Sequence, residues 1–576
     1  MITEKKNRYS KYIPPAIFFG VALIFSLPFL LKWNYIGPRD WELFVTMAAI
    51  PVKSVLYYFQ FPFFNPYLAG GNILFAHPEV AVFSPFFLIL LLFGAIGGLK
   101  LQILIVYFLG FWGSWLFSRQ LGLSKISSYL VSFVYFGSSY FALHFSAGHM
   151  PFTHFCFLPW FLYFLLKANE NRKYLLAGAL SIALIILGNG AAIPFLYSCF
   201  FSGVFILLYS IEKKNYRYLK YYFFAILAGL LLAAVKFIPM YVELSQFPWA
   251  GKPDDFTPLG IIPAAFFSFN QYIFRELGSG FNWTWHEYGA YISPAVVLIA
   301  IVGLIYKFRS CRLWLITAIF FFIFGLGSFS DYSLWNLFMN LPGFASIRVP
   351  SRAFQFVVLS VAVIAGFGLD YIINHLKDSV SSIKHIAIAL VTLILLGNFL
   401  VNLPSFNTID YKLPQKQTFN EEFRHEIGDA NDIYRMFQRN RGSLMAPWLS
   451  AYKESRGLVS QNNQVAMEYI MSGKLQVISR NYTPNKIEYE IAPTSDGKII
   501  FGIGYDIGWS CRDGRDLFEE HGLVAANFST DDKKIVLTYT TPWFYTGLII
   551  SLLTLLIFIL ILFRAEFGNR FKTIFK

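Results

Sequence analysis

Residues 385–402 read HIAIALVTLILLGNFLVN, and residues 541–563 read TPWFYTGLIISLLTLLIFILILF. Both runs are close to the ~20 residues that an α-helix needs to cross a hydrocarbon core about 30 Å thick. Neither alternates apolar and polar residues as a barrel strand does, and a helix satisfies its backbone polar groups within the segment. With similar runs elsewhere, they predict a polytopic α-helical membrane protein with about 12 transmembrane helices, the others being residues 12–31, 101–117, 127–145, 151–167, 174–189, 191–211, 222–240, 291–306, 313–330 and 353–373.

The composition supports this class of protein. Of the 576 residues, 56% are hydrophobic and 14% are charged, whereas soluble domains carry about 25% charged residues. The Lys and Arg residues behind the net charge of +14 lie mostly in short loops between the apolar runs, where membrane topology explains them. No stretch resembles a nucleic-acid-binding module, so nucleic acid is excluded as a partner. The four cysteines are widely spaced and show no metal-binding pattern, which argues against a structural zinc site.

The topology follows from the basic clusters, which mark cytoplasmic loops. All the clusters fall on one side if the twelve runs cross the bilayer and the apolar run 80–98 does not. We therefore expect 80–98 to be a re-entrant or interfacial segment, and 41–57, which contains Pro51 and Lys53, to be an amphipathic helix on the membrane surface. Both termini are then cytoplasmic, together with the clusters at 5–11, 119–125, 167–173, 213–220, 307–312, 377–384 and 564–576.

The longest outer segment in this topology, residues 403–540, differs in character from the rest. From about residue 474 it contains short runs of alternating apolar and polar residues, separated by Asp, Gly and Ser as in Ser495-Asp-Gly. This pattern is typical of antiparallel strands and predicts a small extracytoplasmic β-rich domain resembling a sandwich. The expected organisation is a transmembrane domain at 1–402 with a first outer loop at 32–100, the outer domain at 403–540, and a final helix with a cytoplasmic tail at 541–576.

Two acidic residues open the first outer loop. Asp40 and Glu42 follow the first predicted membrane helix, at the boundary between lipid and water. A carboxylate at this level can act as general base toward an acceptor hydroxyl or, with other oxygens, hold a divalent cation such as Mg²⁺ or Mn²⁺. The alternative is a pair of solvated acids that end the helix.

Two arginines four residues apart lead into the predicted helix 353–373. Arg348 and Arg352 can share one helix face at this spacing, and cytoplasmic anchoring does not explain them because the topology places them outside. Arginine recognises phosphate through several planar, charged donors, so the pair predicts a phosphate clamp. The alternative is contact with outer-leaflet headgroups. Lys236, near the outer end of run 222–240, is a further candidate, although it can also snorkel to the interface.

Aromatic and histidine side chains complete the candidate site. Trp285, His286 and Glu287 precede a membrane run; tryptophan stacks on sugar rings and the acid binds hydroxyls, although an interfacial aromatic girdle explains them equally. His149 is the middle one of three histidines spaced five residues apart, a spacing that does not place them on one helix face. We expect His149 to donate a hydrogen bond to substrate rather than to bind a metal.

Several motifs are missing from the sequence. It contains no GxxxxGK[ST] loop, no GxSxG and no HExxH. Their absence argues against an ATP-driven transporter and against the hydrolases and metalloproteases that carry the other two motifs. No inverted repeat is visible, which weakens the case for a secondary transporter.

A series of short motifs runs in order along nearly the whole chain. The motifs are Asp40, Asn65-Pro-Tyr-Leu-Ala-Gly-Gly, Phe83-Ser-Pro, Arg119-Gln-Leu-Gly-Leu-Ser-Lys, Glu287-Tyr-Gly-Ala-Tyr-Ile, Leu341-Pro-Gly-Phe-Ala-Ser-Ile-Arg-Val-Pro-Ser-Arg, Ala365-Gly-Phe-Gly-Leu-Asp, Asn481-Tyr-Thr-Pro-Asn-Lys-Ile-Glu-Tyr, Tyr505-Asp-Ile-Gly-Trp and Asp513-Gly-Arg. Each is weak alone, but in this order the chain resembles the YfhO-like family of bacterial membrane proteins, which is grouped with the GT-C glycosyltransferase superfamily.

The resemblance implies a GT-C-like fold and a glycosyltransferase that uses a polyprenyl-phosphate sugar donor. Family members are linked to glycosylation of cell-envelope polymers such as teichoic acids, so it implies an envelope glycan or polymer as acceptor, at the bacterial cytoplasmic membrane. Such enzymes carry an essential acid early in the first outer loop, which here is Asp40. The common pattern has small or polar residues after that acid, whereas this sequence has Asp40-Trp-Glu42, which leaves open which carboxylate is the base.

These inferences combine into one hypothesis. Arg348 and Arg352, with Lys236, hold the donor phosphate and stabilise its growing charge as leaving group, while Asp40 removes the proton of the acceptor hydroxyl. Single displacement would invert the anomeric centre, and the outer domain would bind the acceptor or shape the cleft. Two alternatives stay open: a non-enzymatic transporter or flippase for a lipid-linked glycan, and an assembly protein for such glycans.

Overall fold

Helices dominate the structure, a computed structural model in which eight of the described helices are long and apolar enough to cross a membrane. Counting one strongly bent helix pair as a span makes nine. These helices make the chain a multi-pass membrane protein. The described residues are 11–246, 255–277, 281–341, 343–344, 347–377, 380–407, 412–414, 422–428, 432–444, 458–459 and 465–574.

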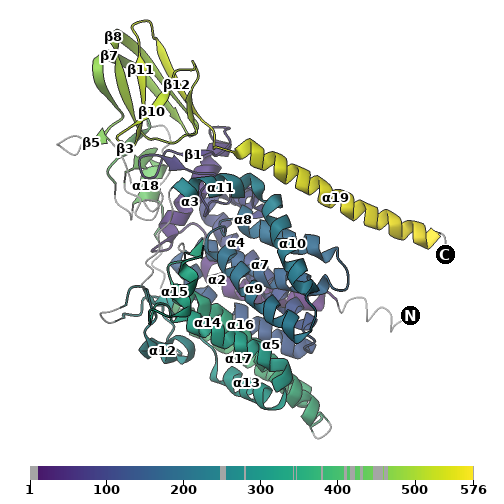
Figure 1. Ribbon diagram of the computed structural model, residues 1–576. Coiled ribbons are helices and arrows are strands. Elements are labelled where there is room, and N and C mark those ends of the chain that lie inside the picture. The colour runs from purple at the N-terminus through teal and green to yellow at the C-terminus, as the bar shows by residue number, and fades with distance from the viewer. Residues whose placement is uncertain are drawn as a thin grey trace.

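The helices form one body that carries most of the strands at one end (Figure 1). The long spans are α2 (Ile13–Leu30), α4 (Pro85–Gln120), α5 and α6 together (Lys125–Phe136, Ser139–Ala147), α9 (Ile193–Glu212), α14 (Phe308–Gly325), η5 with α16 (Pro350–Ala353, Phe354–Leu376), α17 (Ile383–Asn407) and α19 (Phe544–Ile574). The shorter helices are α3 (Trp41–Leu56), η1 (Met150–Cys156), α7 (Phe157–Lys167), α8 (Tyr174–Leu187), α10 (Arg217–Leu232), α11 (Ala234–Gln246), η2 (Leu259–Ile261), α12 (Ile262–Phe267), η3 (Trp285–Glu287), α13 (Pro294–Tyr306), α15 (Leu334–Met339) and α18 (Ile433–Gln438).

The prediction of one straight span at 222–240 is wrong. The chain bends by 88° between α10 and α11, so α11 lies nearly perpendicular to α10. Lys236 in α11 donates hydrogen bonds to the carbonyl oxygen of Gly188, at 2.6 Å, and to that of Val80. Because these carbonyls lie outside any helix ladder, the bonds hold α11 across the end of α8 and satisfy polar groups there.

Helix α4 unites two segments that the sequence analysis treated separately. It includes most of run 80–98 and the whole of the predicted span 101–117, with a break at Gly94. The φ of 72° and ψ of 170° at this position are readily adopted only by glycine. A Cβ atom on Gly98 would lie only 2.9 Å from the Cα of Leu90, so the part of α4 before Gly94 turns back against the part after it. The re-entrant or interfacial placement of run 80–98 stays a prediction. Residues 5–10 of the first basic cluster lie outside the described residues.

The predicted surface helix 41–57 forms as α3, but protein rather than lipid covers much of it. Trp41, Val45 and Ile50 are all 0% exposed. The indole Nε1 of Trp41 donates to the carbonyl oxygen of Ser146 at 3.1 Å, which ties the start of α3 to the end of α6. One side of the first turn of α3 is therefore held against the helical body.

Close packing of α13 against α16 brings two distant segments together. A Cβ atom on Gly303 would lie 2.5 Å from the carbonyl oxygen of Ile364, and Gly368 faces Gly303 across the same contact. Small residues allow membrane helices to approach this closely. Because α13 follows η3 and α16 follows η5, the contact aligns these two short helices at one end of the pair.

The outer strands form one curved antiparallel sheet, so the predicted sandwich of two sheets is wrong. Strand β8 is long enough to pair with β7 along one edge and with β12 and then β11 along the other. The sequence Ser495-Asp-Gly, expected to form a turn, lies inside β8. The sheet order is β10-β11-β8-β12-β9, with β7 beside β8. The strands are β7 (Glu468–Thr483), β8 (Lys486–Gly504), β9 (Trp509–Cys511), β10 (Leu517–Glu520), β11 (Leu523–Phe528) and β12 (Lys534–Tyr539).

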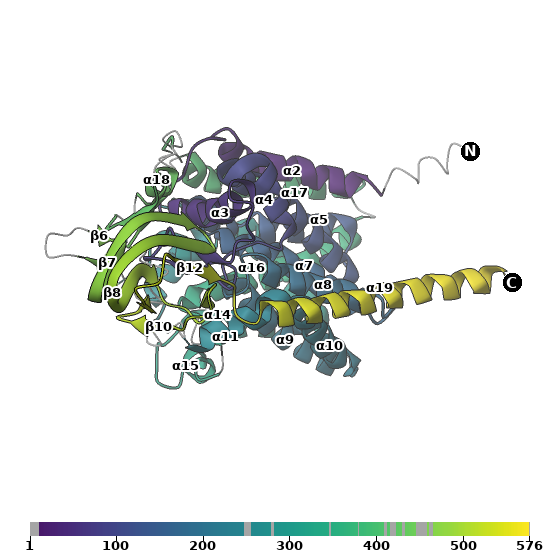
Figure 2. The same cartoon turned by 90° about the horizontal axis from the view of Figure 1, so that it is seen from above.

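Further short strands lie in the first outer loop and in the part of the outer domain that precedes this sheet. Phe64 of β1 packs its ring against Trp509 and Tyr539 of the large sheet, with ring centroids 4.9 and 4.7 Å apart. Viewed from above, the start of α2 and the end of α19 lie on the side of the helical body away from β7 and β8 (Figure 2). The short strands are β1 (Phe64–Asn65), β2 (Asn72–Ile73), β3 (Arg424–Glu426), β4 (Arg441–Ser443), β5 (Leu458–Val459) and β6 (Val465–Ala466).

Candidate active site

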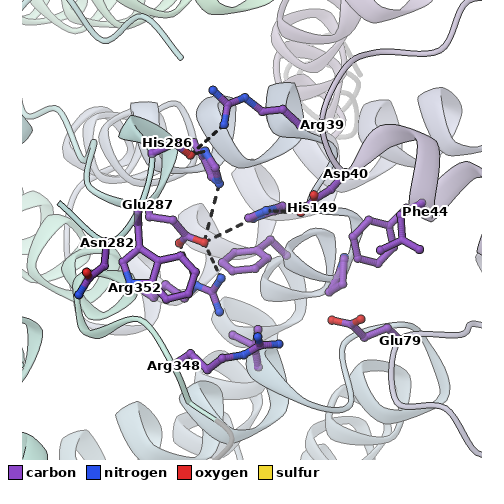
Figure 3. A pocket seen from close by; sticks show the side chains of 16 residues that line it. Arg39, Asp40, Phe44, Glu79, His149, Asn282, His286, Glu287, Arg348 and Arg352 are labelled. Carbon is purple, nitrogen blue, oxygen red and sulfur yellow. Dashed lines mark hydrogen bonds and ion pairs between the residues drawn. The ribbon is translucent and has the colours of Figure 1, made fainter. Parts of the chain in front are cut away.

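A cavity of about 440 Å³ lies where the start of α3, η1, η3 and η5 meet. It gathers side chains from six separate segments of the sequence, and charged groups face one another across it (Figure 3). Six of the nine predicted site residues line it. The lining residues are Arg39, Asp40, Leu43, Phe44, Glu79, His149, Pro151, Phe152, Ile193, Asn282, Trp283, Thr284, His286, Glu287, Arg348 and Arg352.

Asp40 occupies the N-cap position of α3, and its Oδ2 lies 2.8 Å from His149 Nε2. The backbone makes this pair possible, because the Asp40 amide donates to the carbonyl oxygen of Ala147 at 3.2 Å. Gly148 between them has a φ of 90°, and any side chain there would meet the backbone of Trp41. A glycine is thus required for α3 to approach this turn.

Electrostatics keep Asp40 ionised. Burial raises the pKa of its carboxyl, but the hydrogen bond and charge of His149 outweigh burial, and the pKa lies below its usual value. The Nδ1 atoms of His149 and His144 are 2.9 Å apart. Asp40, His149 and His144 therefore form a chain of hydrogen bonds that leads from the cavity into the protein.

A buried ion pair forms the next wall of the cavity. Arg352 Nε donates to Glu287 Oε2 at 2.8 Å, and a second guanidinium nitrogen contacts Oε1 at 2.5 Å. The two side chains are only 9% and 2% exposed. Burial raises the pKa of Glu287, but the charge and hydrogen bonds of Arg352 outweigh it and hold the pKa well below its usual range. Arg352 lines the cavity, as the clamp hypothesis requires, but much of its charge is balanced by Glu287.

Glu79 and Arg348 also line the cavity, and sequence reasoning named only the arginine as a site residue. Burial raises the pKa of Glu79 to about 7, although the positive charge of Arg348 acts in the other direction. Figure 3 shows Glu79 below Phe44 at the right, whereas Arg348 enters from the left, below Arg352. The only sequence signal for Glu79 was an acid between prolines in the first outer loop. Pro342, Ala345 and Ser346 of the arginine motif lie outside the described residues.

Three predicted site residues lie away from the cavity. Glu42 points instead to the outer domain, where its Oε1 accepts a hydrogen bond from the Tyr434 amide at 3.2 Å. Trp285 is 0% exposed and donates from Nε1 to Gln271 Oε1 at 3.1 Å. The Lys236 ammonium donates hydrogen bonds to backbone carbonyl oxygens, as described above.

The position expected for Trp285 is taken by Trp283, which lines the cavity two residues earlier. A second short chain of polar contacts lies at the rim of the cavity beside Trp283. Arg39 donates to Thr284 Oγ1 at 2.9 Å, and this hydroxyl lies 2.7 Å from His286 Nδ1. Burial lowers the pKa of His286 to about 3. His286 is therefore neutral, and it faces Glu287 without charge.

One group of described residues has the spacing of metal ligands. His144, His149 and Glu287 each offer an atom within 4.8 Å of the others. Two imidazoles and one carboxylate are a donor set typical of zinc rather than of Mg²⁺ or Mn²⁺, which prefer oxygen. Arg352 already occupies both oxygens of Glu287. This cluster therefore does not suit Mg²⁺ or Mn²⁺, and the divalent-cation site considered at Asp40 stays a prediction.

No protein-family model matches the chain, and no curated protein matches it. Among solved structures it is similar to arabinofuranosyltransferase AftD from Mycobacteria, with a TM-score of 0.44 and 16% identity over 69% of this chain, and it spans only 27% of that protein. ArnT from Cupriavidus metallidurans bound to undecaprenyl phosphate gives a TM-score of 0.46 with 13% identity, covering 76% of this chain and 87% of that one. The Archaeoglobus fulgidus oligosaccharyltransferase gives 0.36 with 14% identity, covering 74% and 62%.

Proposed function

We propose that the chain is a membrane glycosyltransferase that transfers a sugar from a polyprenyl-phosphate donor to a hydroxyl of a cell-envelope glycan or polymer. One observation carries this proposal. A single cavity contains an ionised carboxylate, held by a histidine, together with two arginines from the start of a membrane-spanning helix. These are the groups that an inverting sugar transfer from an anionic lipid needs.

The donor phosphate would lie against Arg348, with Arg352 behind it. A sugar phosphodiester carries one negative charge, and the phosphate gains a second when the bond from the anomeric carbon to its oxygen breaks. Guanidinium groups placed before the reaction stabilise this growing charge without reorganising. The Phe44, Leu43 and Ile193 side chains give the cavity an apolar wall for the first part of the lipid.

Asp40 would act as general base. The acceptor oxygen attacks the anomeric carbon from the face opposite the phosphate, and its proton passes to the Asp40 carboxylate as the new bond forms. His149 holds this carboxylate in place through the 2.8 Å contact. The product is inverted at the anomeric carbon, and the lipid phosphate leaves as a dianion.

The finer assignments belong to this proposal as well. We infer a YfhO-like enzyme of the GT-C superfamily in the bacterial cytoplasmic membrane, with both termini cytoplasmic and residues 403–540 outside. Its acceptor is an envelope polymer of the teichoic acid class. Support comes from the order of motifs along the sequence and from the cavity residues.

The test is sugar transfer by the purified full chain in lipid nanodiscs, with a radiolabelled polyprenyl-phosphate hexose and a teichoic acid extract as acceptor. We expect Asp40→Asn to abolish transfer while the binding of polyprenyl phosphate is retained. Lys533→Ala, an exposed change between β11 and β12, is the control. Full transfer by Asp40→Asn removes Asp40 as base. Lipid movement across the bilayer without transfer would instead favour a flippase.

A further inference from the structure

Helix α3 is attached to the outer domain at both of its ends. Near its start, Glu42 Oε1 accepts a hydrogen bond from the Tyr434 amide at 3.2 Å. Near its end, Lys53 Nζ donates to Asn440 Oδ1 at 2.9 Å. Both partners belong to one short piece of the outer domain, residues 432–440, which contains α18.

The geometry of the helix makes these two contacts parts of one interface. Glu42 and Lys53 are separated by roughly three helical turns, since a turn takes about 3.6 residues. Their side chains therefore leave α3 on the same face, and α18 packs along that face. The segment 432–440 thus runs alongside α3 and contacts it near both of its ends.

Burial of the Lys53 ammonium costs free energy, and the ammonium has specific partners. Its side chain is only 5% exposed, and burial lowers the pKa of its ammonium to about 7. The ammonium also donates to the hydroxyl of Tyr67 at 2.7 Å and lies 5.2 Å from the ring centroid of Phe437. A buried lysine that donates to an amide and a phenol and lies against aromatic rings fixes a position rather than adding stability.

We propose that residues 432–440 of the outer domain are a positioning element that sets where α3 lies and hence where Asp40 points. This inference rests on the proposed function for its effect on catalysis, although the interface itself does not. Asp40 is the N-cap residue of α3, and its carbonyl oxygen accepts the hydrogen bond of the Phe44 amide at 2.9 Å. A shift of α3 along its axis therefore moves Asp40 with it.

The consequence for catalysis follows from the short distances in the site. Asp40 meets His149 at 2.8 Å, and a displacement of about 1 Å at a reacting group can cost around 100-fold in rate. The outer domain would then be part of the catalytic unit, because it holds the base in register with the acceptor. Glu42 and Lys53 act through Asp40, so they are positioning residues and do not touch substrate.

The test uses paired variants in the full chain. Glu42→Leu removes the acceptor of the Tyr434 bond, and Glu42→Gln keeps an oxygen there. Asn440 has a φ of 57°, so Asn440→Gly removes its side chain without backbone strain, and Asn440→Asp keeps the oxygen. Arg435→Ala changes α18 without touching α3.

Two readouts separate this inference from the proposed function. Hydrogen–deuterium exchange of α3 should become at least about tenfold faster in Glu42→Leu and Asn440→Gly and stay unchanged in the oxygen-keeping variants. In transfer assays, kcat should fall about 10–100-fold in the first two, while the donor KM changes less than about twofold. Rescue by Glu42→Gln and Asn440→Asp is expected.

Unchanged exchange in Glu42→Leu and Asn440→Gly would overturn the inference whatever the enzyme does. Equal loss of kcat in the Gln and Leu variants would overturn it too, because the hydrogen bond would then not matter. If the unaltered chain transfers no sugar at all, the proposed function fails, and the exchange data alone decide whether segment 432–440 holds α3.

Discussion

Two acid–arginine pairs line the cavity, and they differ in how they are used. Glu287 and Arg352 form a closed, buried pair with two direct contacts. Glu79 and Arg348 face each other through charge, and the pKa of Glu79 is raised to about 7 by burial. The first pair thus forms a wall of the cavity, and the function proposed above assigns the anionic ligand to the arginine of the second pair.

The largest effect should come from breaking the closed pair. Arg352→Met leaves the Glu287 carboxylate buried without its partner, which costs about 3–5 kcal/mol. We expect a large loss of unfolding free energy in detergent, measured by chemical denaturation. The double variant Arg352→Met with Glu287→Gln should recover much of it, because no uncompensated charge remains. A single variant as stable as the unaltered chain would contradict the comparison.

The next effect should come from the open pair and should be seen in binding. Arg348→Met removes a charged hydrogen-bond donor worth about 1.5–3 kcal/mol, which corresponds to roughly 10–150-fold weaker binding of polyprenyl phosphate. Stability should change little, since Arg348 is only half-buried. Titration of polyprenyl phosphate and a denaturation curve measure the two quantities. Loss of stability without loss of binding would reverse the roles of the two arginines.

A smaller effect should appear as a pH dependence at Glu79. Because its folded pKa is raised from about 4.5 to about 7, its contribution to stability is present at low pH and is lost as the pH rises to about 7. Glu79→Gln should flatten this decline between pH 5 and pH 8, as followed by thermal unfolding. The charges that bear on Glu79 are Arg348, Asp40, His149 and Arg352. A decline of the same size in Glu79→Gln would show that another group causes it.

The smallest effect should come from the Phe152 ring, which lies against the arginine of the closed pair. The Arg352 guanidinium lies 5.1 Å from the ring centroid of Phe152, a cation–π contact worth about 0.5–2 kcal/mol. Phe152→Leu should lower stability by about 1 kcal/mol, well below the loss in Arg352→Met, in the same denaturation assay. Phe152→Tyr keeps the ring and serves as its control. A loss as large as that of Arg352→Met would mean that the ring, and not Glu287, holds the arginine.

Sequence reasoning found the cavity residues that lie next to predicted membrane helices. Asp40 follows the first helix, and Arg348 and Arg352 precede a later one, so the ends of apolar runs marked them. His149 and Glu287 were found in the same way. It could not separate Asp40 from Glu42, because residues two apart on a helix point about 200° apart and only tertiary contacts decide which of the two faces the cavity.

The errors have physical causes that no local pattern reveals. Glu79 lies in a loop, and its importance depends on burial against Arg348, which is far away in sequence. The bend between α10 and α11 depends on carbonyl groups of other segments that bind Lys236. Strand β8 passes through Ser495-Asp-Gly because it has partners on both edges, and paired neighbours override a weak turn signal.

The contact between Gly303 and Gly368 links the packing of α13 against α16 to the candidate site. A single added methyl group at Gly303 would meet the carbonyl oxygen of Ile364 at 2.5 Å and wedge α13 away from α16. Glu287 lies just before α13 and Arg352 just before α16. Moving the two helices apart would therefore separate the Glu287–Arg352 pair. The geometry of the polar cavity thus depends on the absence of a side chain at Gly303, on the packed face of α13.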